Sequence, residues 1–194
     1  MVQSPQHGPR TGRAGRRRQA TRRLAAGLLC LGMLSGCGAK SPRAYPVPES
    51  RRLGAEVEHV WDAACRVLAD RGYDIQRTES AAGVIETEWR TQNADYAANV
   101  FVTKNEDRYS DCGRPGLWES YRRKHVRVTV NLAPVGKQQT EVSVRAAFRT
   151  ERTSLVSQSP APLECRSRGR LEEEIWLESQ VRALSKQIQR PRRE

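Results

Sequence analysis

The sequence of 194 residues contains few of the residues and motifs from which active sites are usually built. It has three histidines, and no Gly-x-Ser-x-Gly, His-Glu-x-x-His or Walker-type glycine motif is present. These absences remove the common signatures of α/β-hydrolases, zinc peptidases and P-loop nucleotide hydrolases. No Cys-x-x-Cys motif or histidine cluster accompanies the five cysteines, so no zinc site is expected. We therefore predict a protein that is not an enzyme and has no metal or other cofactor.

Two groups of acidic residues leave other chemistry open. Glu86 and Glu88 would lie on one side of a strand, where paired carboxylates could hydrolyse a glycan, although alternating charges on a wet sheet face explain them equally well. Glu106, Asp107 and Asp111 are close in sequence, but their spacing is not that of an EF-hand. We interpret these three residues as part of a solvated loop.

No apolar run is long enough to span a membrane. The longest, residues 24–34, has eleven residues, which reach about 16 Å as a helix, roughly half of a ~30 Å hydrocarbon core. Seven arginines and no acidic residue precede this run, an order typical of a secretory signal peptide. We therefore assign residues 1–36 to a leader that is removed. The paired arginines leave export by the twin-arginine route open.

The leader ends in Leu34-Ser35-Gly36-Cys37, which resembles the lipobox of bacterial lipoproteins. The resemblance implies cleavage between Gly36 and Cys37 and lipidation of the Cys37 thiol, which would anchor the chain to a membrane. In proteobacterial lipoproteins an aspartate after the cysteine favours retention in the inner membrane. Gly38 stands there, which implies an outer-membrane protein facing the periplasm. An ordinary signal peptide with a coincidental cysteine is the alternative.

Much of the positive charge of the chain lies in the leader. The net charge is +12, but without the seven leader arginines 27 basic and 22 acidic residues remain, a net charge of +5. This mild excess does not require a nucleic-acid partner, and none is predicted. It is compatible with attraction to anionic lipid headgroups or to peptidoglycan carboxylates.

Beyond the leader we expect a tether over residues 37–52 and a single domain over residues 53–190. The tether contains three prolines and no apolar periodicity, so it should be extended. In the domain, an amphipathic helix over 55–71 ends at Gly72. A second helix covers about 169–188, and its apolar stripe consists of Leu171, Ile175, Leu177, Val181, Leu184 and Ile188.

Between the helices we predict strands at 73–78, 84–89, 96–103, 125–132 and 141–149, with a loop over 104–120. The last two strands alternate apolar and polar residues, as expected for an antiparallel sheet with one wet face. The prediction is an α+β fold, in which a four- to five-stranded antiparallel sheet has the N-terminal and C-terminal helices packed on one face. This arrangement would be a helix-grip-like two-layer sandwich.

Three cysteines would remain in the domain after removal of the leader and lipidation. In an oxidising periplasm two of three are expected to pair. Cys65 falls on the apolar face of the first helix, whereas Cys112 and Cys165 fall in predicted loops. We therefore predict a Cys112–Cys165 disulfide, with three free thiols as the alternative.

A group of basic residues is predicted to project from the wet face of the sheet. Arg127, Arg145 and Arg149 occupy the polar positions of the two clearest strands, where they could dock an acidic partner, lipid headgroups or glycan carboxylates. The alternative is a solvated face neutralised across strands by Glu86, Glu88 and Glu141.

Three segments of the domain resemble the opening of small bacterial envelope lipoproteins of the BamC-like kind. They are residues 60–68 (VWDAACRVL), 72–75 (GYDI) and 83–89 (GVIETEW). The resemblance covers residues 60–89 and the element order, and it implies a helix-grip-like fold and an envelope location, with no catalytic residues to carry over.

With the lipobox, this resemblance predicts a non-catalytic accessory lipoprotein that binds an envelope protein or an outer-membrane assembly complex. One alternative is a lipid or small-ligand carrier or sensor with an apolar pocket between helices and sheet. Such a pocket would be closed if large side chains such as Trp61, Trp89, Phe148 and Leu184 filled that space. Another is a glycan hydrolase that acts through Glu86 and Glu88.

Overall fold

The structure, a computed structural model, describes residues 39–47, 49–104, 107–156 and 159–189. The predicted leader, its cleavage position after Gly36 and the predicted lipidation site Cys37 lie outside these residues. In the described chain the elements are β1 (Arg51–Leu53), α2 (Val57–Asp70), β2 (Ile75–Glu79), β3 (Val84–Thr87), β4 (Arg90–Ala98), β5 (Thr103–Lys104), β6 (Ser110–Asp111), β7 (Glu119–Gly136), β8 (Gln139–Ser154), β9 (Ala161–Ser167) and α3 (Arg170–Gln189).

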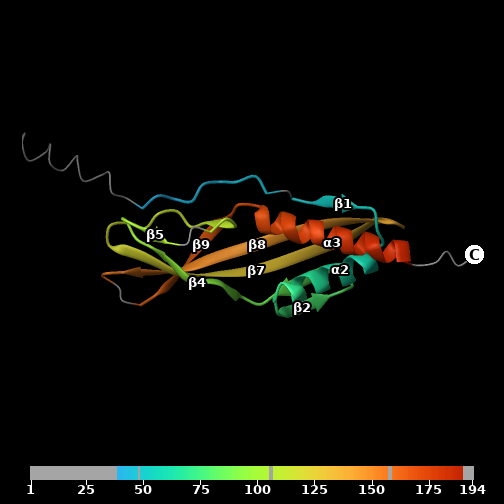
Figure 1. Ribbon diagram of the computed structural model, residues 1–194, viewed down its shortest axis with the longest axis horizontal. Coiled ribbons are helices and arrows are strands. Elements are labelled where there is room, and N and C mark those ends of the chain that lie inside the picture. The colour runs from blue at the N-terminus through green and yellow to red at the C-terminus, as the bar shows by residue number, and fades with distance from the viewer. Residues whose placement is uncertain (1–38, 48, 105–106, 157–158, 190–194) are drawn as a thin grey trace, which may run out of the picture. The chain divides into compact units, whose positions relative to one another are not determined.

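The sheet is built on a long antiparallel hairpin of β7 and β8 (Figure 1). Shorter strands share its two edges: β3 and β4 pair with different parts of β7, and β1 and β9 pair with different parts of β8. The strands β2, β5 and β6 extend the sheet further out, and every pairing is antiparallel. The predicted α+β class is confirmed, but the prediction of four or five strands is wrong, because the described residues form a sheet of nine.

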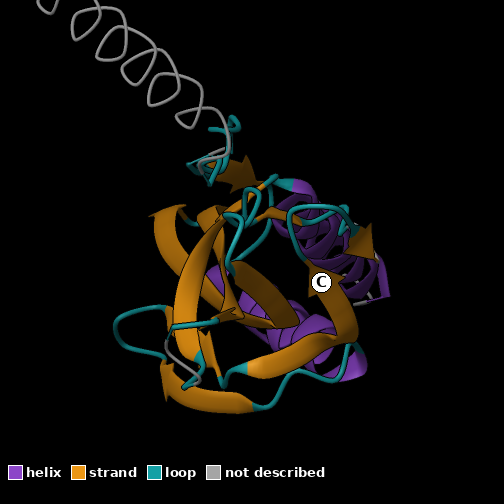
Figure 2. Ribbon diagram, turned by 90° about the vertical axis from the view of Figure 1, so that its left-hand side faces the viewer, coloured by secondary structure: helices purple, strands orange, loops and turns teal. Residues whose placement is uncertain are grey.

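Both helices pack against one face of this sheet, and Figure 2 shows the sheet curving around them. The apolar side chains of β7 and β8 alternate as predicted, and Val126, Val128 and Phe148 are completely or almost completely buried. They meet Val67 of α2 and Ile175 of α3 in a single core. Burial of such side chains is worth about 1.5–3 kcal/mol each, so this shared core is the main reason for the layered arrangement.

The buried stripe of α3 differs from the predicted one. Leu171 and Ile175 are buried as expected, but farther along the helix Ser179 and Ala183 face the core. The predicted core residues Leu177, Val181, Leu184 and Ile188 are exposed instead, which corrects the prediction.

Polar contacts with α2 accompany this orientation of α3. Arg182 forms an ion pair with Asp70 of α2 at 2.6 Å, and Lys186 reaches Asp62 of α2 at 2.8 Å. These pairs, with the small side chains Ser179 and Ala183, place the other apolar stripe of α3 toward solvent.

The third predicted strand, over 96–103, is displaced toward the N-terminus. The strand β4 ends at Ala98, and the Asn99 side chain accepts hydrogen bonds from the backbone N–H groups of Phe101 and Val102, at 2.9 and 2.8 Å. This local turn satisfies backbone donors that a continued strand would have used. The chain then returns as the short strand β5.

Residues 39–53 do not behave as the extended tether predicted over 37–52. The backbones of Lys40 and Arg114 exchange two hydrogen bonds, at 3.1 and 3.0 Å, and β1 pairs with β8. Gly113 makes this approach possible, because its φ is 71° and a Cβ added there would lie 2.1 Å from the Lys40 carbonyl oxygen. This segment, blue in Figure 1, therefore lies along the domain.

Among the described helices, none combines the length and the apolar character needed to cross a membrane.

Candidate functional site: a polar pocket around Lys124

The predicted Cys112–Cys165 disulfide is confirmed, with an S–S distance of 2.07 Å, and Cys65 is free. Cys165 does not lie in a loop, however, because it belongs to β9 and stands opposite Phe148 of β8. The disulfide attaches the segment around β6, which was predicted as a patternless loop, to the edge of the main sheet. It therefore fixes one wall of a pocket that the sequence did not predict.

This pocket has a volume of about 380 Å³ and is formed by segments that are far apart in the sequence. Its walls come from residues 40–45, from the chain around β5 and β6, from β7 and from the residue that follows β9. Its charged lining residues are Lys40, Arg43, Arg114, Lys124 and Arg168, with the carboxylates Asp107 and Asp111. Five cations against two anions give the pocket a net charge of +3.

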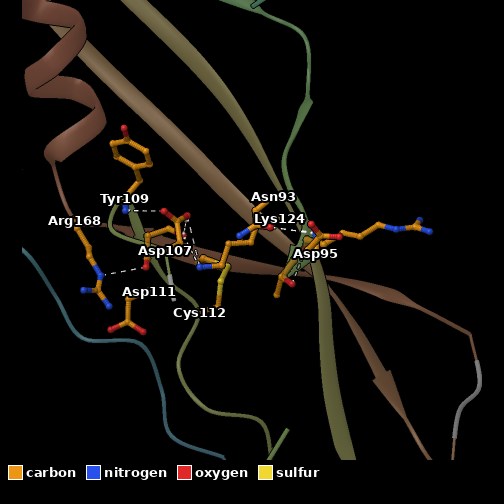
Figure 3. A network of polar contacts seen from close by, with 12 residues as sticks. Asn93, Asp95, Asp107, Tyr109, Asp111, Cys112, Lys124 and Arg168 are labelled. Carbon is orange, nitrogen blue, oxygen red and sulfur yellow. Dashed lines mark hydrogen bonds and ion pairs between the residues drawn. A yellow bond between two sulfur atoms is a disulfide. The ribbon is translucent and has the colours of Figure 1, made fainter. Parts of the chain in front are cut away.

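Lys124 is almost completely buried in the wall of this pocket, with 2 % of its surface exposed. Its ammonium lies 3.6 Å from Asp107 Oδ2 (Figure 3). It also donates to Ser110 Oγ at 3.2 Å and is 4.2 Å from the ring centroid of Tyr96. Burial lowers the pKa of Lys124, and the nearby Asp107 carboxylate acts in the opposite direction.

The position of Lys124 follows from the alternation of β7. Val126 and Val128 point into the core. Lys124, two residues before Val126, lies on the same side of the strand and is also buried. A bulge at Arg123, with φ of 53°, interrupts the pairing with β8 at this point. The Thr150 hydroxyl donates to the carbonyls of Arg122 and Arg123, at 3.1 and 2.8 Å, and stabilises the bulge.

Asp111 connects the pocket to the segment after the predicted lipobox. Burial alone would raise its pKa, but hydrogen bonds from the backbone N–H groups of Gly113 and Arg43 and from the Tyr45 hydroxyl keep the pKa below its ordinary value. The donor distances are 2.8, 3.2 and 3.0 Å. Arg168 contributes through its charge, and its guanidinium lies 5.4 Å from the Tyr45 ring centroid.

The Ser110–Lys124 contact does not have the hydrogen-bond pattern of an activated nucleophile. Ser110 Oγ donates its proton to Asp107 Oδ2 at 3.0 Å and accepts from Lys124, so the hydroxyl proton is not directed at the amine. Ser110 is also only 1 % exposed. The arrangement offers fixed donors and positive charge, which suit anion binding.

Asp107 was predicted to belong to a solvated loop, and this interpretation is wrong. Its side chain is 7 % exposed, accepts from the Tyr109 backbone N–H at 2.8 Å, and pairs with Lys124. The signal that could have located the pair is the alternation of β7, which continues to Lys124 and requires a buried partner for its charge. Glu106 lies outside the described residues.

The predicted basic residues Arg127, Arg145 and Arg149 do share the outward face of β7 and β8. Arg127 pairs with Glu86 at 2.9 Å, and Arg127 and Arg149 lie 5.1 and 4.1 Å from the Trp89 ring centroid. Arg145 is exposed. Trp89 was named among the side chains that could fill the space between helices and sheet, and its position beside Arg127 and Arg149 corrects that expectation.

The core between helices and sheet is filled by side chains such as Phe148 and Leu68. At its edge, between β1, β8 and α3, a cavity of about 20 Å³ has room for roughly one water molecule. This part of the structure gives no support to a carrier of lipid-sized ligands. Within the described ranges, no three histidine, cysteine or acidic residues are grouped in a way that could hold a metal ion.

No protein-family model matches the chain, and a search of curated proteins returned no significant match. The resemblance of residues 60–89 to BamC-like lipoproteins therefore stays a prediction.

Proposed function

We propose that this chain is a non-catalytic, lipid-anchored lipoprotein of the bacterial envelope. It is anchored through Cys37, faces the periplasm from the outer membrane, and serves as an accessory protein for an envelope protein or an outer-membrane assembly complex. The proposal includes a helix-grip-like, BamC-like domain as the binding module, with no cofactor and no nucleic-acid partner.

The observation that carries this proposal is the pairing of Lys40 with Arg114. Cys37 precedes Lys40 by three residues, and three extended residues reach about 11 Å at most. An acylated Cys37 would therefore hold the folded domain directly at the membrane surface, without a long spacer. A short attachment suits a protein that positions a binding surface against neighbouring envelope components.

The basic outward face is the surface that we propose for the protein partner. Arg145 is exposed, and the Trp89 side chain lies between Arg127 and Arg149, which joins an aromatic surface to positive charge. Arginine and tryptophan are enriched among the residues that dominate binding energy in protein interfaces. An envelope partner with an acidic surface would fit this face.

The test is expression of the full-length chain in a bacterium with two membranes, followed by fractionation and mass analysis of the N-terminal peptide. We expect a peptide that begins at Cys37 and carries acyl groups, and a chain that remains with the outer membrane. The variant Cys37→Ala should lose the acyl groups and membrane attachment, whereas Cys65→Ala should keep both.

The partner is tested in the same cells by cross-linking and extraction in mild detergent. We expect a stoichiometric envelope protein to co-purify with the wild type and to be lost with Arg145→Glu and Arg149→Glu. An unmodified Cys37 in a soluble chain would contradict the lipid anchor. A lipidated chain that cross-links to no envelope protein would contradict the accessory role.

A further inference from the structure

We propose that the pocket around Lys124 binds the phosphate group of an anionic membrane-lipid headgroup. This inference rests on the proposed lipid anchor, since it identifies what the domain contacts at the membrane to which Cys37 attaches it. It adds a second, non-covalent contact with the bilayer to the acyl chains.

The first support is unneutralised positive charge. Lys124 is paired with Asp107, but in the described parts of the chain no carboxylate lies within 4.0 Å of the charged nitrogens of Lys40, Arg43 or Arg114. These three side chains line the pocket together with Arg168. Because concave sites with one sign of charge concentrate the field, the pocket should attract anions.

The second support is that several of the lining groups are fixed before any ligand binds. The Cys112–Cys165 disulfide attaches one wall to β9, and the Lys40–Arg114 backbone pair attaches the opposite segment. Arg168 Nε donates to the Ser110 carbonyl at 3.1 Å, which fixes its guanidinium. Groups held in this way lose little conformational entropy on binding.

The third support is size and polarity. A volume of about 380 Å³ is enough for a phosphate with an attached glycerol. Ser41 and Thr103 line the same space, and their hydroxyls can donate to phosphate oxygens. Acyl chains do not fit this polar lining, so the headgroup would enter while the chains remain in the bilayer.

The pocket lies close in sequence to Cys37, which favours a lipid phosphate over a soluble phosphate as its ligand. Residues 40–45 form part of its wall and follow Cys37 by three to eight positions. Once Cys37 is acylated, the pocket lies within a few residues' reach of the headgroups, where lipid phosphate has a high effective concentration. Basic residues near an anionic membrane surface contribute about 1 kcal/mol each, or roughly fivefold in affinity.

The experiment uses the full-length chain, extracted in a non-ionic detergent, and titrates it calorimetrically with dihexanoyl phosphatidylglycerol. Dihexanoylglycerol, which lacks the phosphate, and inorganic phosphate serve as the two comparison ligands. The test variant combines Lys40→Gln, Arg43→Gln and Arg114→Gln. The matched control combines Arg52→Gln, Arg66→Gln and Lys137→Gln, which remove the same charge from exposed positions outside the pocket.

We expect the wild type and the control to bind phosphatidylglycerol with similar affinity and to ignore dihexanoylglycerol. The test variant should bind roughly a hundredfold more weakly while keeping the melting temperature of the control. Equal affinity of the test and control variants would overturn the proposal. Inorganic phosphate that binds as tightly as the lipid would overturn the lipid assignment in favour of a soluble phosphate.

The acyl mass of Cys37, measured on the same sample, separates this inference from the proposed function. If Cys37 is acylated and the test variant binds as tightly as the wild type, phosphate binding in the pocket is contradicted, but the lipid anchor is not. An unmodified Cys37 with binding lost in the test variant contradicts the anchor and supports the phosphate site.

Discussion

The ammonium of Lys124 and the carboxylate of Asp107 lie 3.6 Å apart, and both side chains are almost fully buried, with 3 % and 7 % exposed. They join the central strand β7 to the chain in front of β6, and hydrogen bonds from Ser110 and the Tyr109 backbone complete the coordination of the carboxylate. An ion pair of this kind makes each partner depend on the other, because a single buried charge without its counter-charge is strongly unfavourable.

The variant Asp107→Ala should therefore lower the free energy of unfolding by about 3–5 kcal/mol, because it leaves the Lys124 ammonium buried without a carboxylate. The double variant Asp107→Ala with Lys124→Met should cost clearly less than the sum of the two single changes. Urea unfolding of the four proteins measures this difference. Additive effects within about 0.5 kcal/mol would show that the two groups are not coupled.

Lys124 also predicts a dependence of stability on pH. Burial lowers its pKa in the folded state below the ordinary value of 10.5. At pH values between the folded-state and unfolded-state pKa of Lys124, the unfolded chain binds more protons than the folded chain. This residue therefore makes folding more favourable as the pH rises through that window. The difference in unfolding free energy between the wild type and Lys124→Met should shift in favour of the wild type from pH 7 toward pH 10. A constant difference across that range would contradict burial of the charged amine.

Gly113→Ala should detach residues 39–45 from the pocket, because the new Cβ would meet the Lys40 carbonyl oxygen and the residue would be held at φ of 71°. We expect fast hydrogen exchange at the Lys40 and Arg114 amides and a loss of stability of about 1–3 kcal/mol. Gly136→Ala is the control, since no atom lies within 4 Å of a Cβ at that position. Slow exchange at both amides in Gly113→Ala would mean that the segment is held by other contacts.

Removal of the disulfide should destabilise the domain. Cys112 and Cys165 are separated by 53 positions, and a closed loop of that length corresponds to about 4 kcal/mol in the chain-entropy account, with smaller values common in practice. The variant Cys112→Ser with Cys165→Ser should lower the denaturant midpoint and weaken phosphate binding, because it releases one wall of the pocket. Cys65→Ser, which changes the free cysteine, should do neither.

The orientation of α3 is tested by comparing its two apolar stripes. Ile175→Ala removes a fully buried side chain and should cost about 2–5 kcal/mol. Val181→Ala changes a residue that is 64 % exposed and should alter stability by less than about 0.5 kcal/mol. If Val181→Ala lowered the melting temperature more than Ile175→Ala, the stripe predicted from the sequence would be the one that faces the core.

Most regular elements could be predicted, because their signal is local. The apolar spacing of residues 55–71 predicted α2, and the alternation around Val128 and Val144 predicted the β7–β8 hairpin. The strand β9 was missed although residues 161–167 alternate between half-buried and exposed positions, because Pro160 and Pro162 at its start are typical of a loop. Trp89 was placed on the wrong face because β3 ends at Thr87, before the alternation reaches it.

Local patterns and residue types were enough to predict the two helices, the antiparallel hairpin and the Cys112–Cys165 disulfide. The sequence also carries the lipobox-like segment on which the proposed anchor rests. These features depend on periodicity within one segment or on residue type. Three features could not be predicted: the stripe of α3 that faces the core, the course of residues 39–47 and 49–53 along the domain, and the contact of Lys124 with Asp107 beside a basic pocket. Each of these depends on contacts between distant segments, which local periodicity cannot specify because several partners satisfy the same pattern.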